Sequence, residues 1–110
     1  MTIESSRQGN VAVVQVAGKL DAGSAPAFES ACEQHLREGS THIVVDMSGL
    51  QYVSSMGLRS FLLIARQAKA KNGSVLLCGM NGFVKEVFDM TNVASLFPLF
   101  DNTAAAIGSL

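Results

Sequence analysis

Apolar and β-branched residues gather in three short runs, at positions 11–17, 42–47 and 74–78. Runs of this length and composition are typical of β-strands. We expect the first to pair with the start of the chain across a turn at 8–10. The run at 42–47 is apolar almost throughout, which favours an interior strand that is buried on both faces. A run at 96–100 contains a proline and predicts a short edge strand.

Between the strands, apolar residues recur every three or four positions, which predicts amphipathic helices. The first helix starts near Ser24, which is a candidate N-cap with a proline in the following turn, and it ends at Gly39. The second ends at the Asn-Gly pair 72–73, the third covers 83–90, and the last covers 102–110. The side chains expected to face inward are Phe28, Ala31, Cys32 and Leu36 in the first helix, Leu58, Phe61, Leu62, Ala65 and Ala68 in the second, and Phe83, Val87 and Met90 in the third.

The predicted order of elements is β-β-α-β-α-β-α-β-α. Alternation of strands and helices predicts an α/β fold, with a mixed sheet of four or five strands and helices packed mainly on one face. A chain of 110 residues has the length of one domain, so we expect residues 1–110 to fold as a unit.

Charge and hydrophobic pattern exclude several classes of function. Lys plus Arg number 8 and Asp plus Glu number 9, so the net charge is -1 and no basic face is expected to bind nucleic acid. No apolar run approaches the roughly 20 residues that cross a membrane. The chain starts with a polar stretch that lacks the apolar core of a signal peptide. We therefore expect a cytoplasmic protein with neither nucleic acid nor membrane as partner.

Candidate metal ligands are few. Cys32 and His35 lie three residues apart on one predicted helix, but no second pair stands at metal-ligand spacing. We expect Cys32 and Cys78 to be buried apolar side chains, and His35 and His42 to be surface or edge groups. No phosphate-binding glycine loop follows a strand either. The sequence therefore predicts neither a metal nor a cofactor.

The segment 46–58, D-M-S-G-L-Q-Y-V-S-S-M-G-L, joins an interior strand to the second helix. Either Ser54 or Ser55 could simply cap that helix. A nucleophile elbow requires a glycine two residues before the serine and a histidine partner, but Val53 stands two residues before Ser55. The pattern therefore argues against an enzyme.

Phosphorylation is the third interpretation of this serine pair. The N–H groups and the dipole at a helix start tolerate a phosphoserine, which adds a charge of about -1.5 to -2. The neighbouring side chains are apolar, as in a protein-docking surface that a phosphate would disrupt. These neighbours are Tyr52, Val53, Met56, Leu58 and Met90.

Essentially the whole chain resembles a STAS domain of the bacterial anti-sigma-factor antagonist type. The resemblance is carried by the segments 17–21 (A-G-K-L-D), 43–50, 52–58 and 84–91. In that family, the serine two residues before the helix-start glycine, in a D-S-[ST/A]-G pattern, is phosphorylated by a kinase that doubles as the anti-sigma factor. The matching serine here is Ser55.

This chain departs from the family pattern at two positions. Ser54 replaces the acidic residue of the pattern, and Met56 precedes Gly57. Two adjacent hydroxyls therefore compete, and Ser54 is the second choice as the phosphorylation site.

The resemblance implies a partner-switching protein that is a monomer when free. Unphosphorylated, it binds a GHKL-type serine-kinase anti-sigma factor; phosphorylation of Ser55 releases it, and a metal-dependent serine phosphatase resets it. The expected partner-binding residues are Asp21, Ser54, Met56 and Gly57, although Asp21 could instead cap the turn near Ser24. The alternative function is a non-switching STAS scaffold, or an accessory subunit of a signalling complex or transporter.

Overall fold

The computed structural model describes all residues, Met1–Leu110. Five strands form one sheet in the order β1-β2-β3-β4-β5, in which β1 is antiparallel to β2 and the other neighbours are parallel. The mixed α/β sheet that the sequence predicts is confirmed. In chain order the elements are β1 (Thr2–Gln8), β2 (Val11–Leu20), α1 (Ala25–Arg37), β3 (His42–Val53), α2 (Ser55–Ala70), β4 (Ser74–Cys78), α3 (Gly82–Met90), the 3-10 turn η1 (Ala94–Leu96), β5 (Leu99–Phe100) and α4 (Thr103–Gly108).

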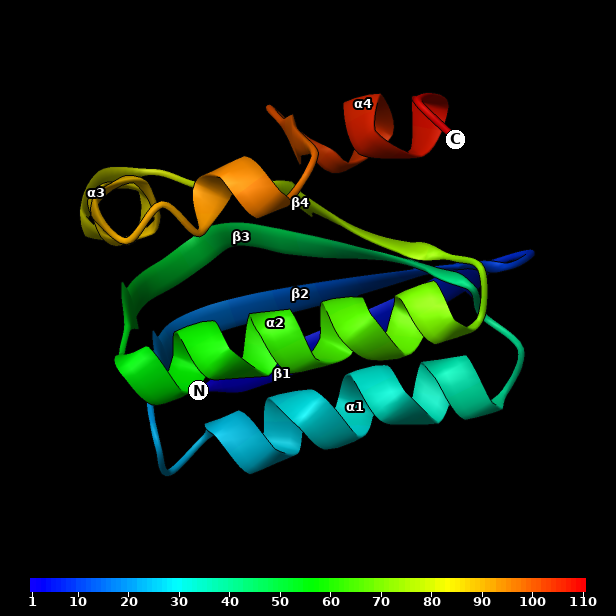
Figure 1. Ribbon diagram of the computed structural model, residues 1–110, viewed down its shortest axis with the longest axis horizontal. Helices are drawn as coiled ribbons and strands as arrows, with labels where there is room; N and C mark the ends of the chain where they lie inside the picture. The colour runs from blue at the N-terminus through cyan, green and yellow to red at the C-terminus, as the bar shows by residue number, and fades with distance from the viewer.

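The helices lie mainly on one face of the sheet. Figure 1 shows α1 and α2 side by side below the sheet, with α4 on the opposite side. Side chains from α1, α2 and α3 share one core of 22 buried residues with the sheet. The face under α4 has a separate cluster of only five buried residues, which includes Ala106. No helix combines the length and apolar character needed to cross a membrane.

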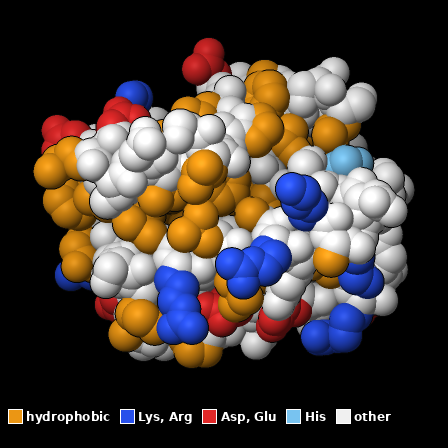
Figure 2. Space-filling view, in the orientation of Figure 1, with side chains coloured by type: hydrophobic (Ala, Val, Ile, Leu, Met, Phe, Trp, Pro, Cys, Tyr) orange, Lys and Arg blue, Asp and Glu red, His pale blue; other side chains and the backbone are white.

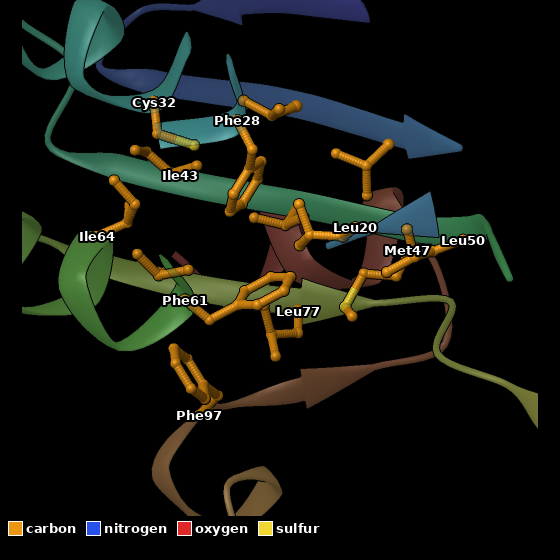
Figure 3. Close-up of a cluster of buried hydrophobic side chains, with 14 of the residues drawn as sticks. Leu20, Phe28, Cys32, Ile43, Met47, Leu50, Phe61, Ile64, Leu77 and Phe97 are labelled. Carbon is orange, nitrogen blue, oxygen red and sulfur yellow. The ribbon is translucent and has the colours of Figure 1, made fainter. Parts of the chain in front are cut away.

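Aromatic rings fill the centre of the main core. The Phe61 ring of α2 lies 5.1 Å from Phe28 of α1 and 5.3 Å from Phe88 of α3, measured between ring centroids. Figure 3 shows Phe28 and Phe61 pointing into one cluster with Leu20 and Met47 of the sheet. These contacts hold α2 against α1 and α3, because aromatic pairs add to the hydrophobic burial.

The inward face of α2 differs slightly from the predicted one. Leu58, Phe61 and Ala68 are buried as expected, but Leu62 is exposed and Ile64 is buried instead. Apolar residues continue around α2 in this stretch, so spacing alone does not identify the buried face.

The prediction for α3 was wrong at two of its three inward residues. Phe83 and Met90 are exposed, whereas Val84 and Phe88 are buried, and only Val87 packs against the core as expected. The edge strand is also shorter than predicted, because η1 takes up Ala94–Leu96 and β5 starts after Pro98.

Candidate functional site

The serine pair lies where the carboxyl ends of β2 and β3 meet the start of α2. Leu20 is paired with Val53 at the ends of these strands, and the backbone N–H of Ser54 donates to the Leu20 carbonyl at 2.9 Å. In Figure 1, α2 and α3 both begin at the end of the molecule where β3 finishes. The serines therefore lie directly after the long strand β3, at the end of the molecule where α2 and α3 begin.

Gly57 allows the close contact between α2 and the strand ends. A Cβ at this position would lie 2.7 Å from the Leu20 carbonyl oxygen and 2.8 Å from Val53 Cγ2, which is closer than packed atoms approach. Gly57 is buried, so its contribution to the site is to position the serines rather than to present a side chain. The role of Gly57 in partner binding stays a prediction, and its place in the structure is consistent with an effect through the serines that it positions.

The two adjacent serines have different environments. Ser54 is the N-cap of α2: its hydroxyl oxygen accepts a hydrogen bond from the Gly57 N–H at 3.2 Å, and its carbonyl accepts one from Leu58. Ser55 is the first helical residue; it is exposed, and its hydroxyl makes no hydrogen bond to the rest of the chain. The sequence allowed either serine to cap the helix, and in the structure the N-cap is Ser54.

Asp21 organises the turn into α1. Its Oδ1 accepts hydrogen bonds from the backbone N–H groups of Gly23, at 3.0 Å, and Ser24, at 3.2 Å. The Ser24 hydroxyl does not cap α1; it donates to the Lys19 carbonyl at 2.8 Å. The turn-capping role considered for Asp21 is therefore present, and its half-buried carboxylate follows directly after the strand end that holds Ser54.

Two residues that flank the serine pair in the chain, Tyr52 and Met56, have exposed apolar side chains. Tyr52 is 38% exposed and Met56 is 42% exposed, whereas Val53 and Leu58, which the sequence placed in the same surface, are buried. The Phe83 ring stacks on Tyr52, with 5.7 Å between centroids and 5° between ring planes. We call Tyr52, Met56 and Phe83 the apolar trio.

Sequence reasoning missed Phe83 because helical spacing placed it inward. The stacking of Phe83 on Tyr52 joins residues 31 positions apart in the chain, and no local pattern reports such a contact. No signal in the sequence distinguishes Phe83, because Val84, Val87 and Phe88 of the same short helix are also apolar.

Both cysteines lie away from the site and are buried. Burial raises the pKa of the Cys32 thiol to about 12, with smaller contributions from Glu33 and Glu29. Burial and the charge of Asp46 raise the pKa of the Cys78 thiol to about 11. At neutral pH both thiols are protonated, so neither is a nucleophile.

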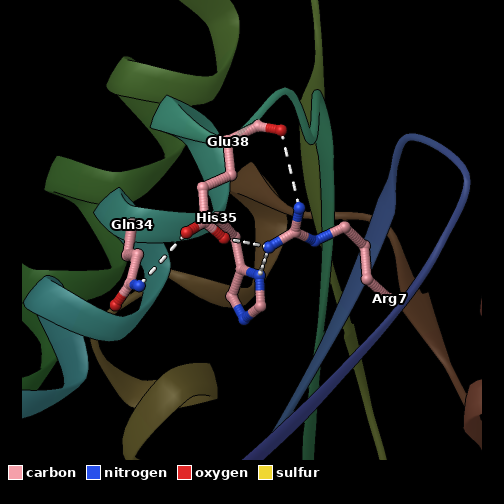
Figure 4. A network of polar contacts seen from close by, with 4 residues as sticks. All are labelled: Arg7, Gln34, His35 and Glu38. Carbon is pink, nitrogen blue, oxygen red and sulfur yellow. Dashed lines mark hydrogen bonds and ion pairs between the residues drawn. The ribbon is translucent and has the colours of Figure 1, made fainter.

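His35 belongs to a polar network that ties β1 to the end of α1 (Figure 4). Arg7 forms an ion pair with Glu38 and approaches His35 Nδ1 at 3.3 Å, and Gln34 donates to Glu38 at 3.2 Å. Partial burial, followed by the Arg7 charge, lowers the pKa of His35. Hydrogen bonds from Arg7 and Gln34 lower the pKa of Glu38. The network lies at the C-terminal end of α1, whereas Ser55 lies at the start of α2.

Comparison with known proteins identifies the family. The STAS domain family model matches residues 2–106. The chain belongs to the STAS domain family. The protein BtrV of Bordetella bronchiseptica, named as an anti-sigma factor antagonist, is 33% identical over 89 residues, which cover 81% of this STAS domain and 77% of the relative.

Solved structures confirm the predicted fold. The anti-sigma factor antagonist SpoIIAA in its unphosphorylated form superposes on this STAS domain with a TM-score of 0.84 and 20% identity, over 96% of this chain and 93% of SpoIIAA. The phosphorylated form of the Bacillus protein gives a TM-score of 0.77 and 19% identity, over 98% of both chains. At such identities the likeness establishes the fold alone.

Proposed function

We propose that this STAS domain is an anti-sigma factor antagonist that is switched by phosphorylation of Ser55. The unphosphorylated chain, a cytoplasmic monomer, binds a GHKL-type serine-kinase anti-sigma factor. The phosphorylated chain is released, and a metal-dependent serine phosphatase restores it. The observation that carries the proposal is the difference between the two serines: Ser54 holds the helix cap, while Ser55 offers a free hydroxyl on the surface.

The geometry suits Ser55 as a phosphate acceptor. Transfer of the γ-phosphoryl group from ATP forms a bond to the Ser55 oxygen, breaks the bond to ADP and releases the hydroxyl proton. Because this hydroxyl has no partner within the domain, no hydrogen bond is lost in the transfer. Phosphorylation of Ser54 would cost the bond from the Gly57 N–H and the cap of α2, which is worth about 1 kcal/mol. The nucleotide and the metal belong to the kinase and the phosphatase.

Release follows from the surroundings of Ser55. The apolar trio provides the kind of exposed aromatic and methionine side chains that are enriched in protein interfaces. A phosphate next to it adds about -1.5 to -2 charge, which is hydrated in the free domain but must be desolvated in a complex. The half-buried carboxylate of Asp21 and the Ser54 backbone lie at the same strand ends and complete the proposed contact surface.

Phosphate mapping tests the choice of serine. The chain is incubated with ATP and a GHKL-type serine kinase from the same genome, and the phosphopeptide is sequenced by mass spectrometry. We expect one phosphate, on Ser55, that Ser55→Ala abolishes.

The matched control is Ser54→Ala. This variant loses only the helix cap, so it should be less stable by about 1 kcal/mol and still accept phosphate at Ser55. Phosphate found on Ser54, or lost in Ser54→Ala but retained in Ser55→Ala, would contradict the proposal.

A further inference from the structure

The exposed face of α2 carries a cation, Arg59, about one helical turn after Ser55. Ser55 and Arg59 are four residues apart, which brings their side chains onto the same face with Cβ atoms about 5–6 Å apart. Both residues are exposed. Two further exposed cations, Arg66 and Lys69, follow on this face, and Figure 2 shows Lys and Arg side chains over α2.

Arg59 has no acidic partner in the domain. The two ion pairs, Arg7–Glu38 and Lys85–Asp89, lie on other elements, and the first turn of α2 contains no acidic residue. Glu29 of α1 lines the same shallow hollow as Arg59, but its carboxylate accepts a hydrogen bond from the Ser60 hydroxyl. The guanidinium group therefore remains available to an anion on its own helix.

We propose that Arg59 receives the phosphate of phosphorylated Ser55 in an ion pair along the exposed face of α2. The inference rests on the proposed function, because it concerns the phosphorylated state of that site. A guanidinium group matches a phosphate in charge and geometry, since two N–H groups can donate to two phosphate oxygens. Arg59 would thus act as a positioning residue that holds the phosphate on the free domain.

The other charges near Ser55 do not replace Arg59 in this role. Asp21 and Glu29, which lie beside the start of α2, are acidic and repel a phosphate. Lys19, which pairs with Tyr52 at the end of β2, is an exposed cation on another element, and Lys19→Gln provides a second control. Arg66 lies eleven residues from Ser55, which corresponds to about 16 Å along the helix. That distance exceeds the screening length of about 10 Å in ordinary buffer. Arg66 is therefore a matched control for Arg59.

The test uses phosphoserine that is installed at position 55 during translation, so no kinase is needed. The second pKa of the phosphate is measured by 31P nuclear magnetic resonance in a pH titration at about 0.1 M salt, where the screening length is about 10 Å. A neighbouring cation favours the dianion and lowers this pKa. In Arg59→Gln we therefore expect the pKa to be higher than in the parent by about 0.2 to 0.4.

Controls separate a specific ion pair from a general effect of charge. Arg66→Gln should leave the phosphate pKa within about 0.1 of the parent, Arg59→Lys should preserve part of the lowering, and about 1 M salt should remove the difference. Equal phosphate pKa values in the parent and Arg59→Gln, or an equal rise in Arg66→Gln, would overturn the inference. Failure of a kinase to phosphorylate Ser55 would instead contradict the proposed function. It would not affect the comparison of phosphate pKa values, because the phosphoserine is installed without a kinase.

Discussion

An aspartate should destabilise the domain strongly at Leu58 and only weakly at Met56, two nearby positions of α2. Met56 is 42% exposed and lies beside Ser55, the proposed phosphate acceptor, whereas Leu58 is 8% exposed and belongs to the main core. Met56→Asp and Leu58→Asp introduce the same charge two residues apart in the first turn of the helix. The difference between their losses of stability therefore shows which of the two side chains faces solvent.

The magnitudes follow from burial. Leu58→Asp loses about 1.5–3 kcal/mol of hydrophobic burial and adds a carboxylate with no partner, which costs at least a further 1–3 kcal/mol. The loss is therefore about 2.5 kcal/mol or more. At about 4 °C per kcal/mol or more for a domain of this size, Tm should fall by about 10 °C or more. Met56→Asp loses only partial burial, and a negative charge at a helix start stabilises the domain by about 0.3–1 kcal/mol. Its Tm should change by less than about 5 °C.

Thermal and urea denaturation followed by circular dichroism provide the assay. Leu58→Ala serves as the milder variant if Leu58→Asp does not fold, and it should still lower Tm more than Met56→Asp does. Met56→Asp should also weaken binding to the kinase. If Met56→Asp destabilises the domain as much as Leu58→Asp, then Met56 is part of the core and the docking surface has been placed on the wrong residues.

Three further outcomes follow from the structure. Gly57→Ala should lower the free energy of unfolding by about 1–3 kcal/mol despite the better helix propensity of alanine, because the added methyl group meets backbone at 2.7 Å, and urea denaturation measures this loss. The Cys32 and Cys78 thiols, with pKa values of about 12 and 11, should react with Ellman's reagent only after denaturation; fast reaction of the native protein would show that they are accessible. Because the fold lowers the pKa of His35, the unfolded chain takes up this proton first, so stability should decrease as the pH falls below about 6.5, and His35→Gln should flatten that dependence.

Elements whose pattern is local were predictable from the sequence. The β-branched runs identify β2, β3 and β4, and the helical spacing of Phe28, Cys32 and Leu36 identifies both α1 and its buried face. These patterns reflect burial along a single element, which the sequence records directly.

Features that depend on contact between distant segments were not predictable. Phe83 has the spacing of a core residue, but its ring lies on Tyr52 at the surface. The sequence also could not decide between Ser54 and Ser55 as the cap, because either residue can cap a helix and the choice depends on where α2 begins against the Leu20 carbonyl. The position of the candidate site was thus visible in the sequence, whereas the different environments of its two serines required the structure.

The central claim is that charge on Ser55 controls binding to the kinase without changing the fold. Isothermal titration calorimetry with the kinase and the variants Ser55→Ala and Ser55→Asp tests it most directly. Neither substitution removes a hydrogen bond, so both variants should keep the parent circular dichroism spectrum. Ser55→Ala should bind like the unphosphorylated parent, and Ser55→Asp should bind about 10- to 100-fold more weakly because its carboxylate must be desolvated in the complex. Equal affinity of the two folded variants would contradict the switch and favour a scaffold in which Ser55 has no regulatory role.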